Sequence, residues 1–495
     1  MTQYSTLEST RNFIDREHRM MINGHWCVAN DGKTIPFHNP ATGELLGKVP
    51  AASKVDVDIA VRNAAATFED SEWSRMKPRD RQNLLWRLAD LVERDRQQLA
   101  ELETMNNGKL LSTSLGDVQF SIDFLRYMAG WATKIEGSAL DVSAVAPPGE
   151  VFSGFIRREP IGVVGAIVAW NVPFILACWK LAPALATGCT LVLKPADETP
   201  LTALRLAELV LEAGFPSGVF NVITGTGIEA GAALASHPGV NKLTFTGSTA
   251  VGKQIGKSAM DNLARVTLEL GGKSPVIVMP DANLSEAAQG AANAIFANQG
   301  QVCCAGSRLY VHRSVFENVV ADVAAIAQSI KLGNGLDATS QMGPLISSKQ
   351  VERVGAYTEI GRKEGAELLC GGRGVGPGYF FQPTVMVNVG QKNTVVQEEI
   401  FGPVLTALPF DTLDEVLDLA NDTAYGLGAS IWTSSLATAH RAIPKIKSGS
   451  VWVNCHTALD PALPFGGYKG SGLGREMGAA VIEHYTEQKS VLIRA

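Results

Sequence analysis

The chain has 495 residues, of which 46% are hydrophobic and 19% charged, and its formal net charge is −6. This length is enough for two or three domains with hydrophobic cores, and the composition is that of a globular protein rather than a disordered one. The negative charge, without a block of five or more like charges, argues against nucleic-acid binding.

The seven cysteines are sparse, odd in number and never spaced as CxxC. This argues against a disulfide scaffold and a zinc ribbon, so we expect no metal site and a reducing, cytoplasmic location. Residues 1–21 are charged and lack the apolar region of a secretory signal. The uncharged run 160–179 is long enough to cross a bilayer, but its Gly, Asn and Pro residues predict a buried strand leading into a buried helix, and no membrane span.

Helical periodicity is visible at residues 55–67 and 78–104, whereas 140–160 is typical of a loop and strands outside the main sheet. Residues 161–272 then alternate strand and helix signals. Strands are expected at IGVVGAIVAW, TLVLKP, VFNVITG, KLTFTGS and RVTLELGG, with helices between them, including IEAGAALASHPG. Five strands separated by four helices predict a doubly wound parallel α/β sheet.

Helix boundaries in this region also carry signals. Pro183 predicts a kink or an end in the first helix. In the second, Thr199 suits the N-cap, Pro200 the first helical position and Gly214 the end. After residue 272 a second α/β region begins, with a strand at SPVIVM, a helix at 285–297 and a strand at SRLYVH.

Three loops at the carboxyl ends of the predicted strands are candidates for binding a nucleotide. VITGTGIEAG places Gly225 and Gly227 between a strand and a helix, a loose dinucleotide fingerprint that lacks the acidic residue expected about twenty positions later. A simple tight turn explains that loop equally well. FTGSTAVG repeats the geometry with Ser248, and LKPADETP puts Lys194 and Asp197 at a strand end. Three such loops on one sheet edge favour a nucleotide site.

The stretch NQGQVCCAG presents Cys303 and Cys304 in a loop between a helix and a strand. A neutral thiol needs a base or a lowered pKa to act as a nucleophile. No His lies in a local catalytic pattern, and His312 is on the next strand. Most cysteines are small buried hydrophobes, which is what we expect for Cys27, Cys178, Cys189, Cys304 and Cys370.

Two polar residues at other strand ends change the interpretation of Cys303. Glu269 precedes a Gly-Gly pair in LELGGK, and Asn171 in AWNVP has an amide that can donate to an oxyanion. A strand-end Glu is usually solvated, and an Asn before a Pro turn usually caps backbone. Neither residue alone indicates catalysis.

Together these segments resemble the aldehyde dehydrogenase superfamily, and the similarity runs over nearly the whole chain in order and spacing. It rests on AWNVPF, LKPADETP, FTGSTAVGK, LELGGKSP, NQGQVCCAGSR, EEIFGPV and PFGGYKGSGLGRE. The family's G-Q-x-C pattern implies that Cys303 is the nucleophile. It would attack an aldehyde to form a thiohemiacetal, with the oxyanion held by Asn171 and the Cys303 N–H. Hydride transfer would leave a thioester, and Glu269 would activate water and help deprotonate Cys303.

The resemblance also implies a cofactor site for NAD. Lys194 would hold the adenosine ribose, Trp170 and Ser248 the pyrophosphate and Glu399 the nicotinamide ribose, with Phe401 packed nearby. The cofactor-binding set is Trp170, Lys194, Asp197, Gly227, Ser248, Glu399 and Phe401. Asp197 stands where NAD-preferring members usually carry Glu, so we expect NAD preference with some use of NADP.

A substrate pocket is implied by the same comparison of segments. Its expected lining is Val172, Leu176, Trp179, Phe296, Val302, Thr457, Leu459 and Phe465. This lining is apolar and poorly suited to a charged aldehyde such as betaine aldehyde, and Val172 replaces a commonly aromatic position, which would widen the tunnel. The segments VNCHTALDPALPFGG and NFIDREHRMMINGHW are most similar to bacterial phenylacetaldehyde dehydrogenases, which implies an arylacetic aldehyde as substrate.

Family architecture implies a cofactor domain, a catalytic domain and an oligomerisation element in a homodimer or homotetramer. These would comprise residues 1–139 and 160–271, residues 272–470, and residues 140–159 with 486–495, while 471–485 return to the cofactor domain. The alternating C-terminal tail is expected to pair with a neighbour's sheet edge. Alternatives are a broad-specificity aliphatic aldehyde dehydrogenase, a nucleotide-independent cysteine hydrolase and a non-enzymatic relative; the presence of Cys303, Glu269 and Asn171 counts against the last.

Overall fold

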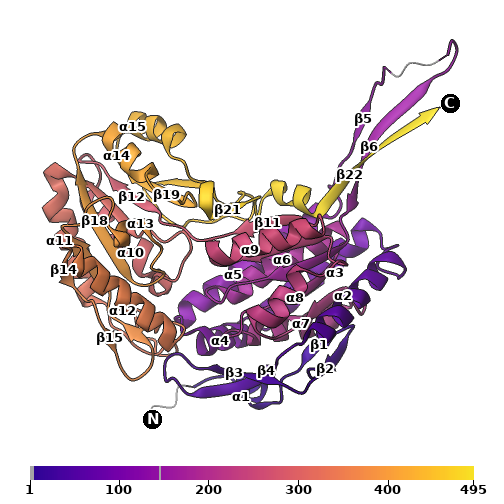
Figure 1. Ribbon diagram of the computed structural model, residues 1–495, viewed down its shortest axis with the longest axis horizontal. Coiled ribbons are helices and arrows are strands. Elements are labelled where there is room, and N and C mark those ends of the chain that lie inside the picture. Colours follow the sequence, from indigo (N-terminus) through magenta and orange to yellow (C-terminus); the bar gives the residue numbers. More distant parts are fainter. Residues whose placement is uncertain (1–4, 144–146, 495) are drawn as a thin grey trace.

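A computed structural model describes residues 5–143 and 147–494 (Figure 1). Residues 1–4, 144–146 and 495 lie outside the described residues, and with them the start of the N-terminal segment and parts of both predicted oligomerisation segments. Two large sheets with helices on both faces form the body of the molecule, and a narrow three-stranded sheet projects from it (Figure 1).

The first large sheet has eight strands in the order β2-β1-β9-β8-β7-β10-β11-β21. Its centre, β9-β8-β7-β10-β11, is parallel throughout, which confirms the predicted doubly wound arrangement. In the order given, the strands span His25–Cys27, Met20–Ile22, Phe220–Val222, Thr190–Lys194, Val163–Ile167, Lys242–Thr246, Arg265–Glu269 and Gly472–Leu473.

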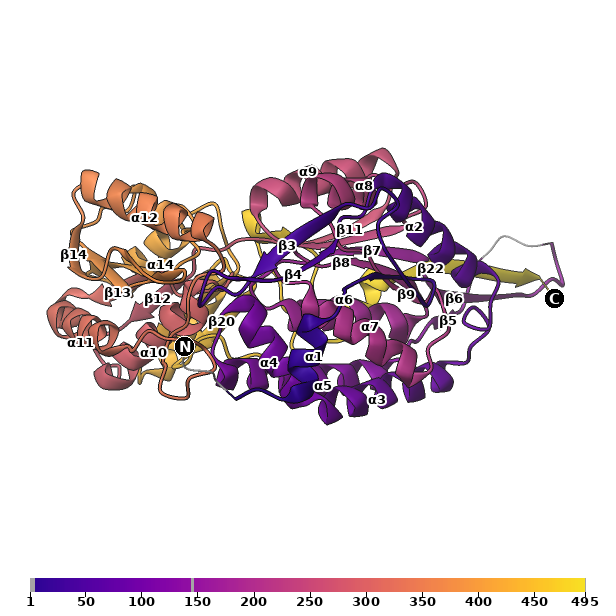
Figure 2. The ribbon, with the colours of Figure 1, turned by 90° about the horizontal axis from the view of Figure 1, so that it is seen from below.

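Helices cover both faces of this sheet (Figure 2). Each face has a separate apolar core. On one face lie α2 (Lys54–Glu69), α8 (Ala232–Ala235) and α9 (Thr249–Asp261). On the other lie α3 (Pro78–Arg94), α4 (Arg96–Asn107), α5 (Leu111–Trp131), α6 (Pro173–Thr187) and α7 (Leu201–Ala213). The uncharged run 160–179 therefore enters β7 and α6, and no helix among the described residues is long and apolar enough to cross a membrane.

The structure confirms helices in the predicted regions and corrects several of their boundaries. Pro183 lies inside a continuous α6, whose residues are all buried, so packing outweighs the roughly 3 kcal/mol that an interior proline costs. Helix α7 begins at Leu201, not Pro200, because the Asn106 side chain accepts the Leu201 N–H at 3.3 Å in place of the predicted Thr199 cap. The region 78–104 forms two helices that meet at Asp95.

Two further helical segments differ from the sequence prediction. IEAGAALASHPG forms a π-helical turn (Gly227–Gly231) and a single turn of α8 rather than one regular helix. Helix α5, which packs against α3, α4 and α6, was not predicted.

The second large sheet has the order β14-β17-β18-β13-β12-β19-β20 and is parallel except for the β14–β17 pair. These strands span Glu367–Cys370, Thr384–Val387, Val404–Phe410, Arg308–His312, Pro275–Val278, Gly428–Trp432 and Ser450–Val453. Helices α10 (Leu284–Phe296) and α11 (Phe316–Ser329) cover one face. The other is covered by α12 (Ser348–Lys363), α13 (Thr394–Gln397), α14 (Leu413–Asn421) and α15 (Leu436–Ala442).

The projecting sheet consists of β5 (Ser138–Leu140), β6 (Phe152–Pro160) and β22 (Thr486–Arg494), in the order β22-β6-β5. The C-terminal strand thus pairs antiparallel with β6 of its own chain from Thr486↔Pro160 to Arg494↔Phe152. One edge of β22 is therefore taken by β6 of the same chain. Only its other edge is open to the expected pairing with a neighbouring chain. The remaining elements are α1 (Glu8–Asp15) and the hairpins β3–β4 (Thr34–His38, Leu45–Pro50) and β15–β16 (Gly374–Val375, Phe380–Phe381).

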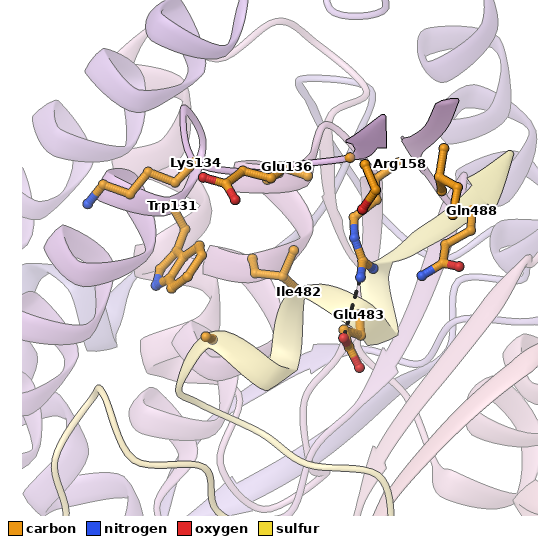
Figure 3. A pocket seen from close by; sticks show the side chains of 12 residues that line it. Trp131, Lys134, Glu136, Arg158, Ile482, Glu483 and Gln488 are labelled. Carbon is orange, nitrogen blue, oxygen red and sulfur yellow. Dashed lines mark hydrogen bonds and ion pairs between the residues drawn. The ribbon is translucent and has the colours of Figure 1, made fainter. Parts of the chain in front are cut away.

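A cavity of about 330 Å³ lies at the root of the projecting sheet (Figure 3). Trp131 and Ile482 form apolar parts of its wall, and the Arg158–Glu483 ion pair at 3.4 Å lies at the side formed by β6 and the C-terminal segment. None of its lining residues belongs to the predicted catalytic, cofactor or substrate sets. The cavity is therefore separate from the site described next.

Candidate active site

Most of the predicted catalytic and cofactor residues gather at the carboxyl edge of the first sheet. Asn171 follows β7, Lys194 ends β8, Ser248 follows β10 and Glu269 ends β11. The strand order places β7 and β10 side by side although β8 and β9 intervene in sequence. Ligands bind open α/β sheets at this kind of switch point.

Cys303 and Cys304 are the two central residues of a tight turn. The Ala305 N–H donates to the Val302 carbonyl at 3.0 Å and closes the turn. Cys303 is partly exposed, whereas Cys304 is buried, as predicted. Cys178 and Cys189 are also buried, but the prediction was wrong for Cys27 and Cys370, which are half-buried. The neighbouring Cys304 side chain, together with burial, raises the pKa of Cys303 well above its usual range. The resting side chain is therefore a thiol, and a base must remove its proton before it can attack.

Hydrogen bonds hold the Asn171 side chain, its backbone carbonyl and the carbonyl of the residue before it. Its amide Nδ2 donates to the Gln301 carbonyl at 3.0 Å, just before the cysteine turn. Its backbone carbonyl accepts from Asn298 Nδ2 at 3.1 Å, and Asn107 Nδ2 binds the preceding Trp170 carbonyl at 2.7 Å. One amide N–H of Asn171 is used by Gln301, which leaves the second for a ligand. Asn107, Asn298 and Gln301 were not among the predicted site residues.

Glu269 is only 4% exposed, and neither carboxylate oxygen has a hydrogen-bond partner among the described residues. Burial raises its pKa well above the usual range, and the Glu476 carboxylate raises it further. The carboxylate lies against Gly466, where an added Cβ would be 2.8 Å from Glu269 Oε1. Glycine at position 466 therefore leaves the room that the Glu269 side chain occupies. A buried carboxyl of raised pKa suits general acid–base chemistry near neutral pH.

A buried ion pair that was not predicted lies beside Glu269. Lys180 Nζ contacts Glu476 Oε1 at 2.7 Å, and both side chains are almost completely buried. Lys180 lowers and Glu476 raises the pKa of Glu269. A lysine within the apolar stretch PFILACWKLAPALAT is a usable sequence signal, because lysine is almost never fully buried without a partner. Its partner is 296 positions away and carries no local signal.

Histidines near the cysteines do not supply a base. His312 ends β13, the strand that follows the turn, and its Nδ1 contacts Ser314. His456 does lie against the turn, but its Nε2 contacts the Cys304 carbonyl at 2.9 Å and its Nδ1 contacts Ser430 Oγ at 2.8 Å. Both ring nitrogens are therefore occupied. Two buried carboxyls, Glu269 and Glu399, interact electrostatically with Cys303. Glu399 already accepts the Gly272 N–H, whereas both Glu269 oxygens lack a partner among the described residues.

The predicted cofactor residues combine cationic, hydroxyl, carboxylate and aromatic groups along the same edge. Buried Lys194 contacts Asp197 at 2.5 Å. Ser248 caps α9, with its Oγ accepting the Val251 N–H at 3.4 Å. Such a helix N-terminus favours a phosphate. Gly227 begins the π-helical turn with open space around its Cα.

Glu399 is brought from the second half of the chain to this edge. Its Oε1 accepts the Gly272 N–H at 3.0 Å, and burial raises its pKa to about 7. A Cβ at Gly271 would be 2.3 Å from Glu399 Oε2, so glycine is needed for this close approach. Phe401 packs edge-on against Trp170 with ring centroids 5.2 Å apart. This donor set fits a dinucleotide whose phosphates meet helix N-termini and whose ribose hydroxyls meet carboxylates.

Most of the predicted substrate-pocket residues share one apolar cluster with Cys303. Its members from that set are Val172, Leu176, Trp179, Val302, Leu459 and Phe465. Phe296 belongs to the neighbouring core of the second sheet, where Val302 also packs. The Trp179 ring packs against two others, with its centroid 5.5 Å from that of Phe465 and 6.4 Å from that of Phe120. Phe120, on the unpredicted helix α5, is thus an additional aromatic neighbour.

Comparisons with known protein families, sequences and solved structures match nearly the whole chain. Residues 26–491 match the aldehyde dehydrogenase family. A phenylacetaldehyde dehydrogenase of Pseudomonas fluorescens is 51% identical, with both chains covered completely. The human mitochondrial aldehyde dehydrogenase is 46% identical over 96% of this chain and 92% of its own. The NAD⁺ complex of an aldehyde dehydrogenase from Bacillus cereus superimposes with a TM-score of 0.97 at 45% identity, covering 99% of each chain.

Sequence similarity, a shared fold and the grouping of Cys303, Glu269 and Asn171 therefore agree. The chain belongs to the aldehyde dehydrogenase family, whose members are oxidoreductases.

Proposed function

We propose that this enzyme oxidises an arylacetic aldehyde, of which phenylacetaldehyde is the simplest, to its carboxylic acid. The observation that carries this proposal is the apolar core against which Cys303 packs, in which the Trp179 ring lies next to both the Phe465 ring and the Phe120 ring. Aromatic side chains offer a substrate ring favourable edge and face contacts. The 51% identity to a phenylacetaldehyde dehydrogenase supports the same substrate class.

In the proposed reaction the Cys303 sulfur attacks the aldehyde carbon and forms a thiohemiacetal. The oxyanion accepts hydrogen bonds from the second N–H of Asn171 and from the Cys303 backbone N–H, and one such donor is typically worth roughly 3 kcal/mol. The cofactor NAD supplies the hydride acceptor, and the substrate is left as a thioester on Cys303. Hydrolysis of the thioester then releases the carboxylic acid.

Glu269 is the proposed base for this chemistry. Its carboxylate takes the Cys303 proton before attack and releases it to solvent. The regenerated carboxylate then takes the proton of the water that cleaves the thioester, as the Cys303 thiolate leaves. Lys194, Ser248, Glu399 and the Trp170–Phe401 pair are proposed to hold NAD. Asp197, which contacts Lys194, is proposed to lie near the adenosine ribose, where its negative charge would repel a 2′-phosphate and favour NAD over NADP.

The domain division expected from the sequence is retained as part of this proposal, with the first sheet assigned to the cofactor, the second to catalysis and the projecting sheet to oligomerisation. All seven cysteines lie in the described part of the chain and are unpaired. We propose a reducing, cytoplasmic location on that basis.

The substrate proposal predicts the highest kcat/KM for phenylacetaldehyde when NADH formation is compared with acetaldehyde and betaine aldehyde. The apolar lining favours a ring over a methyl group by burial, at roughly 25 cal/mol per Å² of apolar surface. A higher kcat/KM for acetaldehyde would contradict the substrate class. Ester hydrolysis without any NADH or NADPH formation would favour a cysteine hydrolase instead.

The nucleophile assignment predicts that Cys303→Ala lowers kcat by about 10³-fold or more, because no thiohemiacetal forms. Cys304→Ala should keep kcat within a few-fold of wild type. It should also speed alkylation of Cys303 by iodoacetamide at neutral pH, because removing the Cys304 thiol removes a neighbour that raises the Cys303 pKa. Equal losses of kcat in the two variants would contradict the assignment.

The environment of Glu269 predicts a pH effect. Glu269 acts as a base when ionised, so the rate of thioester hydrolysis should rise with pH through its raised pKa. In Glu476→Gln the repulsion by Glu476 is lost and the Lys180 charge is uncompensated. Both changes lower the Glu269 pKa. The rising part of the plot of hydrolysis rate against pH, here called the rising limb, should therefore move to lower pH.

Glu476→Asp is the matched control, because it retains the charge and should leave the limb near its wild-type position. Thermal unfolding of both variants checks that breaking the buried ion pair, which typically costs about 3–5 kcal/mol, has not unfolded the protein. A limb that stays in place in folded Glu476→Gln would show that Glu476 does not set the Glu269 pKa.

We also propose that the chain forms a homodimer or homotetramer through the projecting sheet. β22 is an edge strand, and Phe155, Leu492 and Ile493 are exposed on this sheet, at 37%, 54% and 50%. A long edge strand with exposed apolar side chains is a favourable surface for another chain.

The assembly proposal predicts that the double substitution Leu492→Lys and Ile493→Lys lowers the molar mass measured by light scattering after size-exclusion chromatography. Two lysines on a shared edge would place like charges in the interface. Ser490→Lys, an exposed position on the same strand, tests whether added charge alone has this effect. A monomeric wild-type protein would refute the proposal directly.

A further inference from the structure

We propose that His456 is a positioning residue that fastens the segment carrying Thr457 and Leu459 to the cysteine turn, and so couples substrate contact to nucleophile geometry. The substrate part of this inference rests on the proposed function. No role was assigned to His456 from the sequence, where it appears only within VNCHTALDPALPFGG.

The hydrogen bonds of His456 define its tautomer. The Cys304 carbonyl, 2.9 Å away, can only accept, so Nε2 carries the proton and donates it. Nδ1 is then the acceptor for the Ser430 hydroxyl at 2.8 Å. Burial lowers the pKa of His456 to about 4, so the ring is neutral and keeps this arrangement at ordinary pH. Ser430 is a buried residue of β19, which gives His456 a rigid support.

The position of the Cys304 carbonyl matters because Cys303 and Cys304 form the centre of one turn. The Val302–Ala305 hydrogen bond closes the turn on one side, and His456 holds the last carbonyl within it. The Cys303 sulfur and its backbone N–H, which are respectively the proposed nucleophile and an oxyanion donor, both belong to this turn. A shift of this turn therefore moves both groups relative to Asn171.

The same histidine helps to hold the chain segment that carries Thr457 and Leu459 in a strained conformation. Its ring packs on Trp452, with the two ring centroids 4.9 Å apart. Trp452 Nε1 in turn donates to the Ala458 carbonyl at 2.8 Å. Thr457 lies between these two attachments and has φ +63°, which a β-branched residue rarely adopts. The attachments on both sides explain how Thr457 is kept in this conformation. Thr457 and Leu459, two of the expected substrate contacts, thus share a support with the nucleophile.

The test compares His456→Phe, which keeps an aromatic ring against Trp452, with His456→Gln, whose amide can still donate to the Cys304 carbonyl. We expect His456→Phe to lower kcat/KM for phenylacetaldehyde by about tenfold or more, because small misplacements of reacting groups are costly. The loss should be smaller for acetaldehyde, which reaches less of the Thr457–Leu459 segment. His456→Gln should recover part of the loss with both aldehydes.

A second measurement separates positioning from folding. The rate of Cys303 alkylation by iodoacetamide should change in His456→Phe while the melting temperature stays close to that of wild type. If His456→Phe does not fold, Ser430→Ala provides a second test, because it removes the hydroxyl that holds Nδ1 and so loosens the support of the ring without removing the ring. Unchanged kcat/KM for both aldehydes together with an unchanged alkylation rate in a folded variant would overturn the proposal.

The outcome does not depend on which aldehyde the enzyme prefers. If wild type shows no preference for phenylacetaldehyde, the substrate proposal fails, but the alkylation rate and the recovery by His456→Gln still decide the role of His456. If phenylacetaldehyde is preferred and all three variants behave as wild type, the substrate proposal stands and the inference about His456 is refuted.

Discussion

The hydrogen bond from Asn171 Nδ2 to the Gln301 carbonyl joins the two halves of the active site. Asn171 follows a strand of the first sheet, and Gln301 leads into the cysteine turn before the second sheet's strand β13. Attack of Cys303 on an aldehyde requires the nucleophile and the oxyanion donor to keep a fixed relative position. A contact that uses one N–H of the donor amide to hold the nucleophile loop, and leaves the other for the oxyanion, meets that requirement.

Burial has a second, electrostatic effect on the same site. The Glu269 carboxyl is buried and has no hydrogen-bond donor among the described residues, which favours its protonated form. That placement costs folding free energy, as an unpaired buried polar group does. It yields a base with a pKa closer to the working pH than that of a solvated carboxylate. The nearby Lys180–Glu476 pair brings both signs of charge close to this base, so the pKa depends on their balance.

Much of the architecture follows from local sequence patterns. Apolar runs such as IGVVGAIVAW predict strands buried on both faces, and the alternation with helices predicts a parallel sheet whose carboxyl edge carries Asn171, Lys194 and Glu269. What the residues alone left open was the chemistry of Cys303, because its partners come from other strands and loops. Glu476 is 296 positions from Lys180, and His456 is 152 from Cys304. Such contacts depend on strand order and loop course, which periodicity does not specify.

Backbone strain is the other feature that local patterns do not reveal. Asn298, Gln299, Phe401 and Thr457 all have positive φ values, between 47° and 63°, and all lie on segments around the proposed reaction centre. Each such residue typically costs on the order of 1–3 kcal/mol, so surrounding contacts must hold it in place. For Asn298 those contacts include the Asn171 and Gln301 carbonyls, and for Thr457 they are the attachments made by His456 and Trp452. The polar contacts around the cysteine turn therefore both position reacting groups and maintain the strained backbone that presents them. This is why a conservative change at a residue that never touches the aldehyde is expected to alter catalysis.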